Sequence, residues 1–174
     1  MSKDSSLTLQ NFFSRSHDIP VNNKWDTLWE NSETPWDRGL ASPALVELLI
    51  DKHLPLVSPG NPGKALVPGC GRGYDVALFA GLTAEDQKIE KVVGLDVSPK
   101  ALGEARKVHE NADGRVEFVL GDFFSETEDW ATNGPYDVVY DYTVSELRIL
   151  WLMISFSVPS NLISDRNGQK GWGR

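Results

Sequence analysis

The chain has 174 residues, 40% of them hydrophobic and 24% charged, which is enough for one globular domain with its own core and argues against disorder or a fibrous architecture. The net charge of −8 argues against a nucleic-acid-binding surface, because such surfaces cluster lysine and arginine against phosphates. A single cysteine, Cys70, excludes a disulfide framework and a zinc site built on cysteines, and it predicts a reducing, cytoplasmic location.

Residues 1–24 are interpreted as an N-terminal lead-in, because they lack the apolar core of a secretory signal. The most apolar stretch near the other end, residues 149–158, is about half as long as the roughly twenty residues that span a bilayer. We therefore expect no association with a membrane.

The predicted elements begin with a helix at Pro43, for which Ser42 is the expected N-cap. A proline-rich loop then leads into a short apolar strand over residues 64–67. A glycine cluster, Gly69–Gly73, follows this strand and opens a helix over residues 74–80. The order strand, tight turn, helix is therefore predicted for this part of the chain.

The same unit recurs further along the chain. A second strand over residues 91–95 ends at Asp96, and the Ser98-Pro99 pair starts a helix that is predicted to reach about residue 110. Two more strands are predicted over residues 116–120 and 136–140. Four strands separated by helices or long crossovers predict an α/β fold with a doubly wound, mostly parallel sheet that is covered on both faces.

Ligands of such sheets lie beyond the carboxyl ends of the strands, where the glycine cluster and Asp96 are expected. Gly69, Gly71 and Gly73 let the backbone approach a ligand closely, and the helix that follows offers free N–H groups to a carboxylate or phosphate. The carboxylate of Asp96 has two acceptor oxygens for the two hydroxyls of a ribose. Together these features predict an adenosine cofactor.

Two cofactor classes share this arrangement, the nicotinamide dinucleotides and S-adenosylmethionine. Tyr74 occupies the position of the third glycine in the dinucleotide fingerprint, which favours S-adenosylmethionine. After the third strand, Asp122 could accept a hydrogen bond from an adenine amino group and Phe123 could cover the ring. The alternative interpretation of Asp122 is a solvated turn residue.

Three tryptophans, Trp25, Trp29 and Trp36, precede these elements. Either they pack as a core staple, which is the usual role of tryptophan, or they surround a positively charged sulfonium with their π-faces. Both interpretations stay open at this point.

The remaining candidates for chemistry are weaker. Cys70 has no base nearby in the sequence and is expected to be a small filler inside the glycine turn. The three histidines share no metal-ligand spacing and are expected to be solvated, so no metal site is predicted.

The segments WDTLWENSETPWDRG, VPGCGRGYD, VVGLDVSP, GDFF and YDVVYDYT resemble the thiopurine S-methyltransferase superfamily, in particular its thiol and halide methyltransferase branch from fungi and plants. The resemblance covers residues 25–143 and implies a Rossmann-like class I S-adenosylmethionine-dependent methyltransferase. Members of this branch methylate a thiol, bisulfide or halide. By position, the resemblance implies cofactor contacts from Trp25, Trp29, Trp36, Gly69, Asp96, Asp122, Phe123 and Tyr142.

Residues 144–174 do not resemble the family's continuation, so the C-terminal strands of the fold are expected to be missing. The fourth strand would then lie at the edge of the sheet, which predicts self-association through that edge and weak turnover. The alternatives to an active enzyme are an inactive cofactor-binding fragment or regulatory module and, less favoured, a nicotinamide-dependent oxidoreductase. Codons for Val144-Ser145 can match a splice donor, which suggests the hypothesis that this tail is translated intron. Transcripts that are all spliced so that codon 143 leads into residues 144–174, with no longer form, would contradict this hypothesis.

Overall fold

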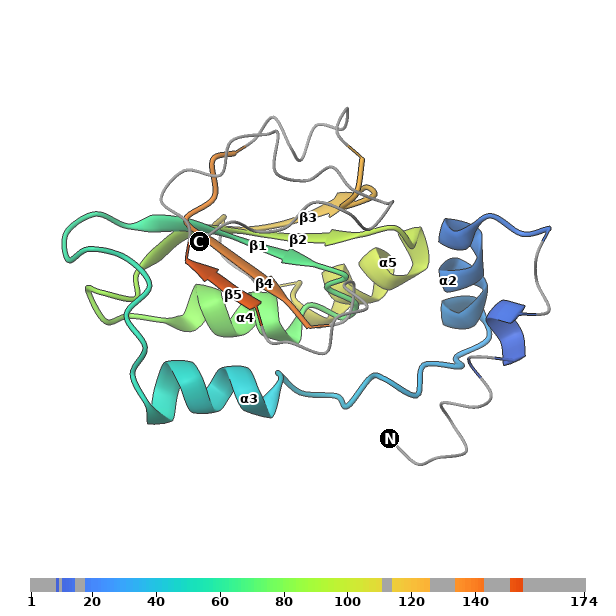
Figure 1. Ribbon diagram of the computed structural model, residues 1–174, viewed down its shortest axis with the longest axis horizontal. Coiled ribbons are helices and arrows are strands. Elements are labelled where there is room, and N and C mark those ends of the chain that lie inside the picture. Colours follow the sequence, from blue (N-terminus) through green and yellow to red (C-terminus); the bar gives the residue numbers. More distant parts are fainter. Residues whose placement is uncertain are drawn as a thin grey trace, which may run out of the picture.

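The computed structural model describes residues 9, 11–14, 18–110, 114–125, 134–142 and 151–154 (Figure 1). Its sheet has five strands in the order β3-β2-β1-β4-β5. The strands are β1 (Gly63–Pro68), β2 (Ile89–Asp96), β3 (Val116–Leu120), β4 (Val138–Asp141) and β5 (Trp151–Ile154). The helices are α2 (Val21–Glu30), α3 (Pro43–Val46), the π-helix η1 (Glu47–Asp51), α4 (Tyr74–Gly81) and α5 (Pro99–Val108). No helix among these residues has the length and hydrophobicity that crossing a membrane requires.

The predicted α/β fold with a mostly parallel sheet is confirmed. Strand β1 pairs in parallel with β2 on one side and with β4 on the other, and β2 pairs in parallel with β3. From β1 the chain therefore adds β2 and β3 on one side of the sheet, and then crosses over to add β4 on the other side of β1. The point between β1 and β4 is the topological switch at which such sheets bind ligands.

The two predicted N-caps differ in outcome. The Ser98 hydroxyl accepts a hydrogen bond from the backbone N–H of Ala101 at 3.1 Å, which confirms the cap of α5. Helix α3 starts at Pro43 as predicted, but the Ser42 side chain caps nothing. The backbone N–H of Ser42 instead donates to Asp75 Oδ1 at 2.7 Å, so this segment is tied to the first turn of α4.

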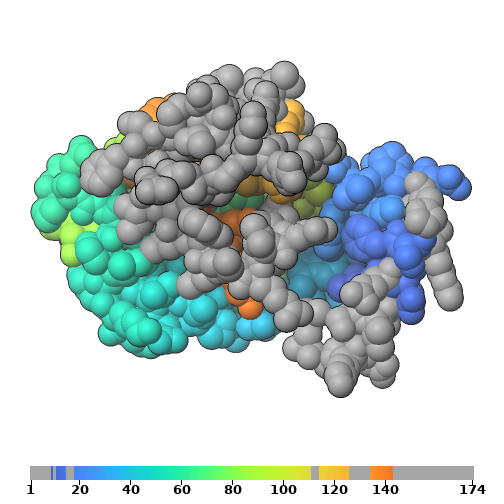
Figure 2. Space-filling model, in the orientation of Figure 1, coloured from blue at the N-terminus to red at the C-terminus, as the bar shows by residue number. Residues whose placement is uncertain are grey.

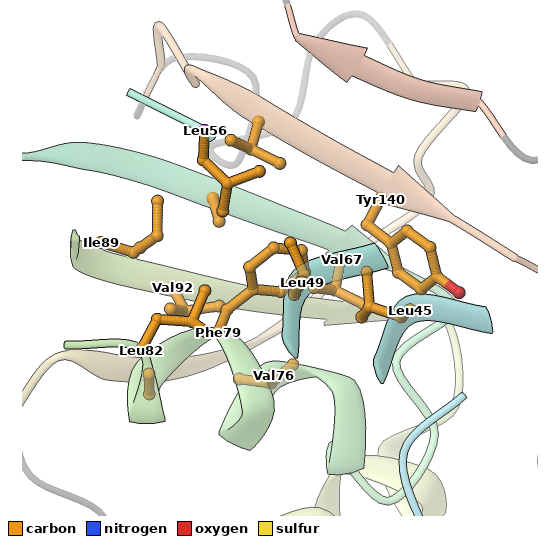
Figure 3. Packing of buried hydrophobic residues seen from close by; sticks show 13 residues of the cluster. Leu45, Leu49, Leu56, Val67, Val76, Phe79, Leu82, Ile89, Val92 and Tyr140 are labelled. Atoms are coloured by element: carbon orange, nitrogen blue, oxygen red, sulfur yellow. The ribbon is translucent and has the colours of Figure 1, made fainter. Parts of the chain in front are cut away.

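The core lies on both faces of the sheet, because neighbouring residues of each strand point in opposite directions. On one face, the helical residues Leu45, Leu49 and Phe79 pack against the sheet in the cluster drawn in Figure 3. On the other face, β1 contributes Leu66 to a smaller cluster. The near-continuous apolar runs of the strands predict a sheet that is buried on both faces, and the two clusters agree with this prediction.

The expected exposure of β4 at the sheet edge is wrong. Strand β5 pairs with β4 in antiparallel fashion, with Val138 opposite Ile154 and Asp141 opposite Trp151. The apolar run of the tail supplies this strand, and its backbone meets the N–H and C=O groups of β4 that would otherwise lack partners. Self-association through an open β4 edge therefore loses its structural basis.

Tyr140 carries an unsatisfied polar group into the core. Its side chain is 1% exposed and packs edge-on against Phe79 with ring centroids 6.1 Å apart. Within the described residues its hydroxyl, at the margin of the cluster in Figure 3, has no hydrogen-bond partner. Burial raises the pKa of Tyr140 to about 12, and the Ser42 hydroxyl acts against that rise. A buried hydroxyl without a partner destabilises the folded chain.

We expect Tyr140→Phe to raise the free energy of unfolding by about 1 kcal/mol, because it removes this unpaired hydroxyl and keeps the ring. Urea denaturation of the variant and the wild type measures the difference. A loss of stability of similar size would mean that the hydroxyl is hydrogen-bonded in solution.

Candidate functional site

The glycine turn joins β1 to α4 and has the backbone that glycine favours. Gly69, Gly71 and Gly73 have φ angles of 59°, 53° and 76°, in the left-handed region that other residues rarely adopt. A Cβ on Gly73 would lie 2.7 Å from ring carbons of Phe118, and one on Gly71 would touch the Trp29 ring at 3.4 Å. The turn is therefore a cradle that a side chain would fill or distort.

Asp96 lies beside this turn at the end of β2 and is only 8% exposed. Its Oδ2 accepts from the Gly71 N–H and its Oδ1 from the Ser98 N–H, both at 2.9 Å. Burial raises the pKa of Asp96, and these backbone donors act in the opposite direction. Because a carboxylate oxygen accepts more than one hydrogen bond, both oxygens keep capacity for a ligand's hydroxyls.

Asp122 and Phe123 follow β3 on the side of Asp96. The Gly121 N–H donates to the Asp96 carbonyl at 3.0 Å, which brings the two strand ends together. Asp122 Oδ1 accepts from the Phe124 N–H at 2.9 Å, so Asp122 is a turn residue at the edge of the site. The Phe123 ring packs partly against the smaller core cluster.

The three tryptophans meet although Trp36 lies outside α2. The Trp36 ring is 5.3 Å from Trp25 and 6.1 Å from Trp29, between centroids, and both contacts are edge-on. Figure 1 shows α2 beyond the carboxyl ends of the parallel strands, beside α5, and Figure 2 shows the α2 segment gathered at one end of the molecule. Trp29 also reaches the glycine turn at Gly71. The tryptophans therefore pack on one another and at the same time border the predicted site.

Arg72, inside the turn, was not among the predicted site residues. Its guanidinium forms ion pairs with Asp37 and Glu104 and lies 5.4 Å from the centre of the Trp29 ring. The carboxylate partners raise the pKa of Arg72, with Asp37 contributing most. This arginine joins the tryptophan segment, the turn and α5. Its place inside the glycine cluster was the only sequence signal for such a role.

The expectation that the histidines are solvated is wrong for His109. Its Nε2 lies 2.9 Å from the Arg72 carbonyl oxygen, and its ring stacks on Phe118 at 5.9 Å between centroids. The cause is the C-terminal end of α5, which comes to lie against the turn. His109 and Phe118 thus form the wall behind Gly73.

Cys70 behaves as the filler that its surroundings predict. Its thiol packs against the main core cluster, and burial, followed by the nearby Asp96 charge, raises its pKa well above the ordinary value. A thiol with a raised pKa is a poor nucleophile at neutral pH. Within the described ranges, no three His, Cys, Asp or Glu side chains gather as metal ligands would.

Asp26 anchors α2 to the domain. Its Oδ1 accepts from the Ser98 hydroxyl at 2.6 Å and from the Lys100 N–H at 3.0 Å, so a carboxylate from α2 supports the N-terminus of α5. Ser98 also bonds to Asp96, which links the anchor to the strand end. Asp26 therefore links the helix that carries Trp25 and Trp29 to the start of α5.

We expect Asp26→Ala to weaken binding of an adenosine ligand by about tenfold, because it removes both hydrogen bonds that hold α2 to the start of α5. A loss of about 1.4 kcal/mol in the free energy of binding corresponds to that factor. Calorimetric titration measures the affinity. Glu30→Ala is the matched control, since Glu30 lies on the same helix with only a 3.6 Å exposed ion pair to Lys100. Equal losses in both variants would contradict the anchoring role.

Comparison with known proteins identifies relatives. A family model described as Thiopurine S-methyltransferase (TPMT) matches residues 21–145. Thiocyanate methyltransferase 1 of Brassica oleracea is 37% identical over 134 residues, covering 73% of this chain and 52% of the relative. Probable thiol methyltransferase 2 of Arabidopsis thaliana is 36% identical over 121 residues, covering 68% and 46%. The chain spans about half the length of these curated relatives.

One solved structure is similar to this chain in both sequence and fold. It is described as "Conversion of a Disulfide Bond into a Thioacetal Group during Echinomycin Biosynthesis" and is 28% identical with a TM-score of 0.54, covering 74% of this chain and 48% of that chain. The fold of this chain is therefore shared with a solved chain of related sequence.

Proposed function

The chain belongs to the thiopurine S-methyltransferase family, and from this premise we propose that it binds S-adenosylmethionine and transfers the methyl group to a small thiol, bisulfide or halide. The observation that carries the proposal is the buried Asp96 carboxylate held against the left-handed glycine turn. The single cysteine supports a cytoplasmic setting.

The described residues fit this cofactor group by group. Asp96 would hold the ribose hydroxyls, and the glycine turn with the start of α4 would receive the methionine carboxylate. Asp122 would accept from the adenine amino group, with Phe123 beside it. With these groups placed, the sulfonium would lie at the edge of the site, next to the tryptophans.

At that edge Trp25, Trp29 and Trp36 would surround the sulfonium, since aromatic faces attract a cation. Tyr142, which follows β4 and is 49% exposed, would contact the cofactor at this same edge, next to the acceptor. When bound, the cofactor supplies a methyl group activated by the positive sulfur. The chain's own part is to align the acceptor with that methyl and to exclude water.

Such a transfer needs little acid–base help, because thiolates, bisulfide and halides are nucleophiles as they stand. The raised pKa of Cys70 speaks against a covalent intermediate on this thiol. Alignment and exclusion of water are therefore the contributions that the site residues would make.

A second candidate is a cofactor-binding module without turnover, because the contacts that carry the proposal, those of Asp96 and the glycine turn, concern the cofactor and not the acceptor. Titration with S-adenosylhomocysteine, followed by transfer of labelled methyl to a thiol, bisulfide or iodide, separates the two. Micromolar binding with turnover supports the enzyme, and binding without turnover supports the module. Binding of a nicotinamide dinucleotide in place of S-adenosylhomocysteine would overturn both.

A further inference from the structure

Arg38 and Tyr142 meet at the edge of the site although 104 residues separate them. Arg38 Nη2 donates to the Tyr142 hydroxyl oxygen at 3.3 Å, and the guanidinium carbon lies 5.9 Å from the centre of the Tyr142 ring. Arg38 follows Trp36 by two residues, and Tyr142 directly follows β4. The contact therefore joins the tryptophan segment to the end of β4.

The charge of Arg38 is not neutralised by any described carboxylate. Asp37, its neighbour, uses Oδ2 for Arg72 and Oδ1 for the Gly39 N–H. Arg72 takes a second carboxylate from Glu104, whereas no ion pair to Arg38 occurs in the described part of the chain. In a protein with a net charge of −8, this guanidinium is a local positive site at the candidate acceptor side.

We propose that Arg38, held by Tyr142, determines acceptor specificity by drawing small anionic nucleophiles such as thiocyanate, iodide or a thiolate to the site. This inference rests on the proposed function and names the charge class of its acceptor. A guanidinium is weakly hydrated and presents several N–H donors in one plane, which suits large, polarisable anions. Arg38 acts on the approach and orientation of the acceptor.

The step that follows is balanced without a base. A lone pair of the anion forms the bond to the methyl carbon while the bond from that carbon to the sulfonium sulfur breaks, and its electron pair stays on the sulfur. The anion and the sulfonium cation become a neutral methylated product and a neutral thioether. The net charge of −8 gives anions no long-range attraction to the protein as a whole, so a local cation such as Arg38 would supply the attraction at the site.

The first test is kinetic. Arg38→Gln is expected to raise KM for thiocyanate about fivefold, because a unit charge a few ångströms from an anion in a water-rich setting contributes a factor of this size. The kcat and the affinity for S-adenosylhomocysteine are expected to stay unchanged. Arg38→Lys retains the charge and should restore most of the effect. Unchanged KM in Arg38→Gln would overturn the proposal.

Lys88→Gln is the matched control, because Lys88 is exposed just before β2, at the opposite end of the sheet, and its replacement changes the net charge by the same amount. If Lys88→Gln raised KM as much as Arg38→Gln does, the effect would belong to the net charge, and the local site would be rejected.

The second test needs no turnover. Iodide quenches tryptophan fluorescence by contact, so a local cation near Trp36 raises the quenching constant for iodide relative to neutral acrylamide. Arg38→Gln is expected to lower the iodide constant and leave the acrylamide constant unchanged. Equal iodide quenching in both proteins would overturn the inference. If the wild type methylates no acceptor, the proposed function fails, and this measurement still decides whether Arg38 attracts anions.

Discussion

Replacement of Asp96 by asparagine is expected to weaken the binding of S-adenosylhomocysteine by about thirtyfold. The carboxylate is the group that we assign to the ribose hydroxyls, and a hydrogen bond to a charged acceptor contributes about 2 kcal/mol, which corresponds to that factor. The two backbone donors, Gly71 and Ser98, bond to different oxygens of Asp96, so the single amide oxygen of asparagine keeps one of these hydrogen bonds and loses the other. Calorimetric titration gives the two dissociation constants.

The control for this variant is Glu90→Gln. Glu90 lies exposed on the same strand near its other end, so its replacement removes one negative charge without touching the site. We expect it to bind the ligand as the wild type does. If Asp96→Asn gave a cooperative thermal transition and unchanged affinity, the assignment of Asp96 to the ribose would be wrong.

Replacement of Gly73 by alanine is expected to lower the free energy of unfolding by about 3 kcal/mol. A φ of 76° is unfavourable for alanine, and the new Cβ would stand 2.7 Å from the Phe118 ring, with His109 at 3.2 Å behind it. Backbone strain contributes about 1–2 kcal/mol and overpacking about as much again. Binding of S-adenosylhomocysteine should fall as well, because the turn that forms the cradle must move. Urea denaturation and titration measure the two effects.

Gly103→Ala is the control that shows whether the effect of a glycine-to-alanine change on stability depends on its position in the fold. Gly103 lies inside α5 and a Cβ there would meet nothing within 4 Å. The same chemical change is therefore expected to raise the free energy of unfolding by about 0.8 kcal/mol, because alanine favours the helix. Opposite signs for the two variants support the interpretation of the turn, and a loss at Gly73 smaller than about 1 kcal/mol would contradict it.

The sequence by itself determined the α/β class, four strand positions, the Ser98 cap and the placement of the glycine turn and Asp96. These features depend on local preferences: apolar runs predict buried strands, glycine permits left-handed backbone, and a residue that ends a parallel strand lies at the carboxyl edge of the sheet. Each can be inferred from a few consecutive residues, so no knowledge of distant contacts was needed.

Only the tertiary structure decided which distant segments meet. It placed Trp36 against the tryptophans of α2, turned His109 onto the Arg72 carbonyl, and paired β5 with β4 where an open edge was expected. It also joined Arg38 to Tyr142. Such contacts depend on how the helices pack and on which strands become neighbours, and one chain's local pattern is compatible with many such pairings.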